Sequence, residues 1–145
     1  MKDKNFIKSA LKVIEIESKA VMNLRNQIQP DFENLCTKIL NIKGKLILMG
    51  IGKSGHIAQK ISATLSSTGT SSLFIHPTEA AHGDLGMIDK QDGVLILSNS
   101  GETKEIIEIL PALKRSAANI FTITNNNQST IAKAGNINLV INAEE

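Results

Sequence analysis

The chain opens with two stretches in which apolar residues recur at helical spacing. Pro30 and Asp31 separate the two stretches, because proline is common at the start of a helix and rarely continues one. We therefore predict two N-terminal helices within residues 1–42, which pack either on the sheet described next or on a second subunit. In the first helix the apolar positions follow mostly at steps of three or four residues, or multiples of these: Phe6, Ala10, Ile14, Val21, Leu24 and Ile28.

After these helices the pattern changes to short apolar runs, which are typical of buried parallel strands. Helical stretches separate most of the runs, at about 53–66, 103–115 and 129–134, while the polar segment 78–90 has neither a helical nor a strand period. This alternation predicts an α/β fold, a five-stranded parallel sheet sandwiched by helices. One domain is expected over all 145 residues, with the α/β core at 45–145. The predicted strands are 45–49, 72–75, 93–97, 119–123 and 137–141.

Composition excludes several classes of partner. Lys and Arg number 16 against 14 Asp and Glu, a net charge of +2 that is dispersed along the chain, so no nucleic-acid partner is expected. Aromatic residues make up 3% of the chain, too few for a platform that stacks bases or sugars. No stretch resembles a membrane span or a signal peptide, which predicts a cytoplasmic protein with no membrane partner. The single Cys36 excludes an intramolecular disulfide and a cysteine-based zinc site.

The loops that follow the first three strands are the candidates for ligand binding, because open parallel sheets bind ligands beyond the carboxyl ends of their strands. The first loop fails as a P-loop, since Ile47 stands where that motif needs glycine. It matches the dinucleotide pattern at Gly50, Gly52 and Gly55, but His76 occupies the place of the expected acid. Two features of this loop still favour ligand binding: its glycines allow a ligand to approach the backbone closely, and the helix that follows offers free N–H groups to an anion. The three loops are 50–55, 76–84 and 98–103.

The loop after the third strand carries three hydroxyl groups around a glycine. Ser98, Ser100 and Thr103 surround Gly101, where the strand gives way to a helix. Hydroxyls and backbone amides that converge at the positive end of a helix form a cradle for phosphate. Simple N-capping, the alternative, would need only one hydroxyl, from Ser100 or Thr103. We therefore favour the phosphate cradle.

Several titratable side chains lie in or beside these loops. Glu105 falls in the first turn of the helix, within reach of a ligand in the third loop, whereas Glu102 is the better candidate for complementing the helix dipole. His82 is interpreted either as an acid–base group or as a hydrogen-bonded surface residue. His56, one turn into a helix, is interpreted as structural. His76 is either a strand-end residue or a ligand contact, and a metal bound by His76 and His82 would lack a third protein ligand.

The three loops together carry a family resemblance. The strings GIGKSGHIAQKISATLSSTG, HPTEAAHGDLGMI and SNSGETKEI, in this order, closely resemble the SIS (sugar isomerase) domain of the arabinose-5-phosphate isomerase family. The resemblance implies a flavodoxin-like three-layer fold and interconversion of D-arabinose 5-phosphate and D-ribulose 5-phosphate. That reaction is the first step toward the Kdo sugar of lipopolysaccharide or capsule. Members of the family typically form tetramers, so the resemblance also implies a homo-oligomer.

The resemblance assigns roles to individual residues of this chain. Lys53 and Glu105 match catalytic residues, and His82 matches a histidine that contacts the substrate. His76 matches a position where an inhibitory zinc ion binds in the family. Substrate and phosphate contacts are implied for Ser54, Gly69, Thr70, Ser98, Ser100 and Thr103.

The implied chemistry is an aldose–ketose isomerisation through an enediol intermediate. It needs a base near the proton on C2, a donor to the carbonyl oxygen and an anchor for the phosphate. We expect Glu105 or His82 to move the proton and Lys53 to stabilise the oxyanion. This reaction requires no cofactor.

The same resemblance predicts that the chain is C-terminally incomplete. Family members continue with a second catalytic glutamate, a His-Pro-Gly-Gly segment and usually a pair of CBS domains, which the 145 residues do not contain. Two further hypotheses therefore stand beside the isomerase: a non-catalytic phosphosugar-binding SIS module and an inactive gene fragment. Dinucleotide binding ranks below all three.

Overall fold

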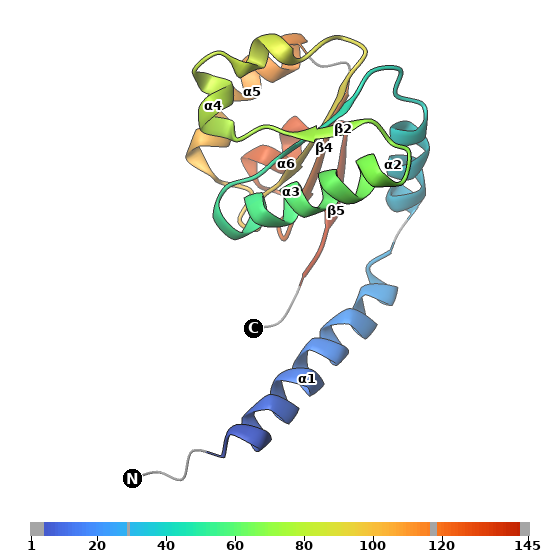
Figure 1. The fold of residues 1–145 in the computed structure, drawn as a ribbon, viewed down its shortest axis with the longest axis vertical. Coiled ribbons are helices and arrows are strands. Elements are labelled where there is room, and N and C mark those ends of the chain that lie inside the picture. Colours follow the sequence, from blue (N-terminus) through green and yellow to red (C-terminus); the bar gives the residue numbers. More distant parts are fainter. Residues whose placement is uncertain (1–4, 29, 117–118, 143–145) are drawn as a thin grey trace.

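The computed structural model describes residues 5–28, 30–116 and 119–142, and its centre is a five-stranded sheet (Figure 1). All neighbouring strands run parallel, in the order β2-β1-β3-β4-β5. The order changes direction at β1, which has β2 on one side and β3 on the other, and ligands of open α/β sheets bind at such a switch point. The strands are β1 (Leu46–Met49), β2 (Ser72–Phe74), β3 (Gly93–Leu97), β4 (Asn119–Thr124) and β5 (Ile137–Val140).

Helices cover both faces of the sheet, which confirms the predicted α/β architecture. Successive side chains of a strand point to opposite faces, so Ile47 and Ile96 pack on one side and Leu46 and Leu95 on the other. The first side is covered by α4 (Pro77–Ala81), α5 (Lys104–Ser116) and α6 (Thr130–Ala134), and the second by α2 (Pro30–Leu40) and α3 (Gly52–Ser67).

The segment 78–90 differs from its prediction as an irregular stretch. It contains most of α4 and a 3₁₀ turn, η2 (Asp84–Met87). Pro77 occupies the first turn of α4, where its missing N–H costs nothing. Helices of four or five residues are too short to display a 3.6-residue period, so the sequence pattern could not show them.

The first helix, α1 (Phe6–Asn23), projects away from the body of the molecule (Figure 1). None of its residues is buried, and a short 3₁₀ turn, η1 (Leu24–Asn26), connects it toward α2. Of the two predicted alternatives, α2 packs on the sheet beside β5, whereas α1 does not, and packing of α1 on a second subunit stays a prediction. None of the helices within the described ranges combines the length and apolarity needed to cross a bilayer.

Candidate phosphosugar site

A cleft of ≈ 360 Å³ opens at the carboxyl edge of the sheet, between α3 and the ends of β3, β4 and β5. It brings together three residues singled out from the sequence, Lys53, Ser54 and Ser98. Lys53 is the only charged residue in the lining of this cleft within the described part of the chain, so an anion here would meet a positive field. The remaining lining residues are Ile57, Leu97, Asn99, Ile123, Thr124 and Ile141.

Glycines let α3 start immediately after β1, at the mouth of this cleft. Gly52 has φ +57°, in the left-handed region that a side chain disfavours. A Cβ atom on Gly55 would lie 2.7 Å from the carbonyl oxygen of Gly50. The start of α3 can therefore approach the end of β1 this closely only because both residues lack a side chain. Ile51 precedes the helix in an extended conformation and provides no side-chain cap. The first N–H groups of α3 therefore remain available to a ligand at this edge.

The hydroxyl groups of the third loop organise the loop itself. Ser98 Oγ accepts a hydrogen bond from the Gly101 N–H (3.1 Å) and lies 2.8 Å from Thr103 Oγ1. Ser100 Oγ accepts from the Glu102 N–H at 3.2 Å. These bonds lie ahead of α5, and within residues 5–28, 30–116 and 119–142 no side chain accepts from the first N–H groups of the helix. Simple capping of α5 by Ser100 or Thr103 is not what the structure shows.

Other helices of the chain do have side-chain caps, so the open starts of α3 and α5 stand out. Asn5 caps α1, and His76 Nδ1 accepts from the N–H of the second residue of α4. At α6, Ser129 is the N-cap and Glu102 Oε1 accepts from the Thr130 N–H at 2.7 Å. This hydrogen bond holds the pKa of Glu102 below its ordinary value. Glu102 thus caps the start of α6, and its predicted interaction with the dipole of α5 stays a prediction.

Glu105 and His82 lie outside the cleft, although their elements are neighbours. Glu105 is exposed in the first turn of α5, and His82 is exposed directly after α4, which packs against α5. Both residues belong to the face of the sheet opposite α3, at its carboxyl edge. The structure therefore separates the cleft with Lys53 from a second, open group that contains the two candidate acid–base residues.

One ring nitrogen of His76 is already hydrogen-bonded to the backbone of α4. Its Nδ1 accepts from the Thr78 N–H at 3.3 Å, and its ring meets that of Phe74 edge-on, with centroids 6.4 Å apart. Across the described ranges no three His, Cys, Asp or Glu side chains gather closely enough to hold a metal ion. Within one copy, a zinc ion at His76 would therefore find fewer than three such ligands among the described residues.

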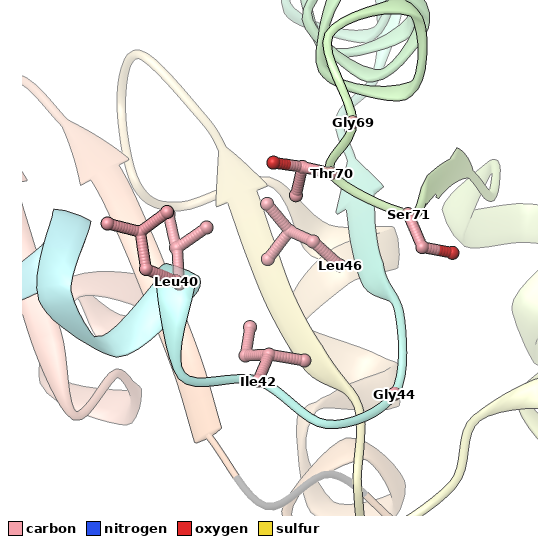
Figure 2. A pocket seen from close by; sticks show the side chains of 8 residues that line it. Leu40, Ile42, Gly44, Leu46, Gly69, Thr70 and Ser71 are labelled. Carbon is pink, nitrogen blue, oxygen red and sulfur yellow. The ribbon is translucent and has the colours of Figure 1, made fainter.

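Gly69 and Thr70 lie at the opposite, amino edge of the sheet, where α3 leads into β2. They line a separate hollow of ≈ 300 Å³ with Leu40 and Leu46 (Figure 2). The 16 residues of α3 span about 24 Å at the helical rise, which places this hollow at the far end of the helix from Lys53. A pentose phosphate bound near Lys53 cannot reach Gly69 or Thr70 of the same copy.

Asn99 and Thr124 line the cleft, although neither stands out among the candidates in the sequence. The predicted ligand loops follow only the first three strands, whereas Thr124 lies at the end of the fourth, β4. Its side chain is buried, and its Oγ1 donates to the Asn126 carbonyl oxygen at 3.1 Å. The same carboxyl-edge rule, applied to the fourth strand, identifies Thr124. Asn99 falls within the third loop, but the hydroxyl residues beside it carry the stronger signal for phosphate.

Gly101 is expected to be the most sensitive position of the third loop. It has φ +68°, and a Cβ atom there would collide with Oγ and Cβ of Ser129. Gly101→Ala should lower the free energy of unfolding by about 3 kcal/mol, the sum of backbone strain and displacement of the α6 cap. Urea denaturation measures this change.

Gly52→Ala is the matched control for this experiment. Gly52 has a similar φ of +57°, but a Cβ atom added there would have no neighbour within 4 Å. Gly52→Ala should therefore lower the free energy of unfolding only by the cost of the backbone strain, about 1–2 kcal/mol. If both variants lost the same free energy of unfolding, the close approach of Gly101 to Ser129 would not contribute to the effect of Gly101→Ala.

The family model and the curated relatives that match this chain all point to the same family. The model of the SIS domain family matches residues 38–145. The arabinose 5-phosphate isomerase KdsD of Pseudomonas aeruginosa is 50% identical over 135 residues, which cover 93% of this chain and 41% of the relative. The isomerase KpsF of Escherichia coli O6:H1 is 48% identical over 132 residues, 90% of this chain and 40% of the relative. The chain thus spans about two fifths of the length of these curated relatives.

Two solved structures align with nearly the whole chain, α1 included. The c3406 protein of Escherichia coli CFT073, in complex with arabinose 5-phosphate, is 39% identical with a TM-score of 0.93, covering 99% of this chain and 77% of that one. A protein of Listeria monocytogenes is 25% identical with a TM-score of 0.95, covering 100% of this chain and 76% of that one.

Proposed function

Because this chain belongs to the SIS domain family, we propose that it binds D-arabinose 5-phosphate at the carboxyl edge of its sheet and interconverts it with D-ribulose 5-phosphate. One observation carries this proposal: the open starts of α3 and α5 and the ammonium group of Lys53 converge on one edge of the sheet. Uncapped helix starts favour anions. Relatives named arabinose 5-phosphate isomerase share 50% and 48% identity with the chain.

The phosphate is proposed to lie at the loop 98–103, where the start of α5 supplies N–H groups. Ser98 and Thr103 are hydrogen-bonded to each other, which fixes the loop before the ligand arrives. A preformed loop loses less conformational entropy on binding than a mobile one. Lys53, across the cleft on α3, then lies on the side of the sugar away from the start of α5.

Lys53 is proposed to stabilise the oxyanion, and Glu105 or His82 to move the proton between C1 and C2. In a 5-phosphate the reacting carbons are at the opposite end of the sugar from the phosphate, so Lys53 and His82 need not lie at the loop that holds the phosphate, whereas Glu105 lies next to it in the first turn of α5. The oxyanion develops as the proton leaves C2, and a cation next to it stabilises the transition state more than the ground state. The enediol chemistry uses these side chains without a redox cofactor.

Binding can be tested separately from turnover. Addition of D-arabinose 5-phosphate at 100 times its dissociation constant should stabilise the folded chain by about 2.7 kcal/mol, whereas D-arabinose without phosphate should give no shift at the same concentration. Thermal unfolding and titration calorimetry measure the two effects. Equal responses to both sugars would refute a phosphate-based site.

The second candidate function is binding of a phosphosugar without catalysis. The observation that favours it is the position of Glu105 and His82, which are exposed and outside the cleft. Conversion of arabinose 5-phosphate followed by ¹³C NMR distinguishes the two functions, because a binding module gives the thermal shift but no ribulose 5-phosphate.

The same proposal extends to pathway, location and assembly. The product would feed formation of the Kdo sugar, and the protein would act in the cytoplasm. The active form would be a homo-oligomer. Each follows from the likeness to the isomerase family and not from the geometry of the cleft.

A further inference from the structure

The loop 98–103 is held along one side by α6 and by the turn that precedes this helix. Three hydrogen bonds make the contact, two between backbone groups and one that uses a side chain, and together we call them the α6 clamp. In each bond the loop supplies the acceptor and the segment 125–131 supplies the N–H. The bonds run from the Asn125 N–H to the Asn99 carbonyl oxygen at 2.9 Å, from the Ile131 N–H to the Gly101 carbonyl oxygen at 3.0 Å, and from the Thr130 N–H to Glu102 Oε1 at 2.7 Å.

The two backbone bonds of the α6 clamp fix the direction of two peptide groups in the loop. The C=O and the N–H of one trans peptide point in opposite directions. Because the carbonyl oxygens of Asn99 and Gly101 point toward the α6 side, the N–H groups of Ser100 and Glu102 point away from it. Ser100 Oγ accepts the Glu102 N–H on that side at 3.2 Å. A loop that turns its carbonyl oxygens away and its N–H groups outward suits an anion.

The start of α6 is rigid enough to serve as the fixed side of this contact. Ser129, the N-cap of α6, accepts from the Ala132 N–H at 3.3 Å, and its Oγ donates to the Asn126 carbonyl oxygen at 2.7 Å. Gly101 is buried and approaches Ser129 so closely that a Cβ atom would collide with it. The loop and α6 therefore fit together at a backbone distance that leaves little room for a shift of either one.

Glu102 supplies the one side-chain hydrogen bond between loop 98–103 and α6 within the described ranges. Its carboxylate is exposed, and Lys133 on α6 adds a favourable charge. A negative charge in a phosphate-binding loop repels the phosphate. The charge of Glu102 therefore does not favour binding of the proposed ligand, whereas its hydrogen bond to α6 restrains the loop that would bind it.

We propose that Glu102 is a positioning residue for the phosphate-binding loop, which it holds in the binding orientation through the N–H of Thr130. This role rests on the proposed function. Without the bond, the loop would sample more conformations in the free chain, and ordering it would consume part of the binding free energy. Contacts to the phosphate are the same in the substrate and in the transition state, so their loss raises KM and leaves kcat unchanged.

Two substitutions of Glu102 separate its reach from its charge. Glu102→Asp keeps the charge but is one carbon shorter, so it cannot reach the Thr130 N–H, whereas Glu102→Gln loses the charge and keeps an oxygen at the same reach. Glu102→Asp should raise the KM and the dissociation constant of D-arabinose 5-phosphate by about 3–10-fold, the effect of one lost hydrogen bond. Its kcat should not change, and Glu102→Gln should keep the wild-type values. Initial rates and titration calorimetry measure these constants, and the dissociation constant alone decides if the chain binds without turnover.

Glu108→Asp is the matched control. It shortens a carboxylate of α5 by the same one carbon, and Glu108 is exposed and lies 3.8 Å from Lys104 on its own helix. This variant should keep the wild-type KM and dissociation constant. A merely structural effect of Glu102→Asp would lower the folded fraction, which reduces the apparent kcat and does not change KM.

Amide hydrogen exchange follows the clamp in the absence of any sugar. The Thr130 N–H should exchange faster in Glu102→Asp than in the wild type and in Glu102→Gln. Unchanged exchange or unchanged KM and dissociation constant in Glu102→Asp would overturn the role of Glu102, and so would binding by Glu102→Gln as weak as by Glu102→Asp.

Failure of this role and failure of the proposed function give different results. A wild-type chain that binds neither D-arabinose 5-phosphate nor inorganic phosphate would overturn the proposed function, and the role of Glu102 with it. Equal affinity of the wild type and Glu102→Asp for D-arabinose 5-phosphate would overturn only the role of Glu102.

Discussion

Lys53→Ala and Glu105→Gln should each reduce kcat for arabinose 5-phosphate by about 10²–10⁴-fold, in a preparation of the wild-type protein that turns the sugar over. Lys53 is the charged residue of the cleft lining, so its removal leaves the developing oxyanion without a cation. Glu105→Gln keeps the size of the side chain but removes its ability to take a proton. Initial rates of ribulose 5-phosphate formation, measured over a range of substrate concentrations, give kcat and KM for each variant.

The two substitutions should differ in their effect on binding. Lys53→Ala should also weaken binding of the phosphosugar, because the cleft loses its positive charge, whereas Glu105→Gln should leave the dissociation constant nearly unchanged. Lys60→Ala on α3 and Glu108→Gln on α5 are matched controls, since both residues are exposed and outside the cleft. Full activity of Glu105→Gln together with loss in His82→Gln would transfer the proton-shuttling role to His82.

The sheet and its ligand edge were predictable because they depend on local patterns. A buried parallel strand needs four or five consecutive apolar residues, and Leu46–Met49 and Gly93–Leu97 are buried throughout. Parallel strands end at one edge, so loops that are far apart in sequence had to meet there. The meeting of Lys53 and Ser98 in one cleft follows from this rule alone.

The parts that were not predictable depend on contacts between distant residues. Glu102 caps a helix that starts 28 positions later, and nothing near Glu102 in the sequence indicates this bond. The resemblance assigned Gly69 and Thr70 to the ligand, yet a family motif does not state which edge of the sheet a residue occupies. The spacing of apolar residues in the first helix predicts that the helix packs on something, but an amphipathic pattern is the same whether the partner is the sheet or a second subunit.

At the amino edge of the sheet, the carboxylate of Asp92 is held by the backbone of two loops. The residue is 1% exposed, Oδ1 accepts from the Lys45 N–H, and Oδ2 accepts from the Asp89 N–H at 2.9 Å. Lys45 Nζ lies 3.3 Å from Oδ2. Burial alone would raise the pKa of Asp92, but these hydrogen bonds outweigh it and hold the pKa below the ordinary value of 3.8. The charged carboxylate is therefore the form that the fold stabilises.

Asp92→Ala should accordingly lower the free energy of unfolding by about 3 kcal/mol at pH 7, because two buried N–H groups lose their acceptor. Since the pKa of Asp92 is lower in the folded than in the unfolded chain, its contribution is complete above about pH 4 and is lost as the pH falls through the folded value. Asp92→Asn should remove this acid-dependent contribution, so that the free energies of unfolding of wild type and variant converge toward low pH.

Urea denaturation at pH 7 and at pH 3 measures both effects. Substitution of the exposed Asp89 by Asn is the control. A constant difference between wild type and Asp92→Asn across this range would show that the charge of Asp92 does not contribute to stability.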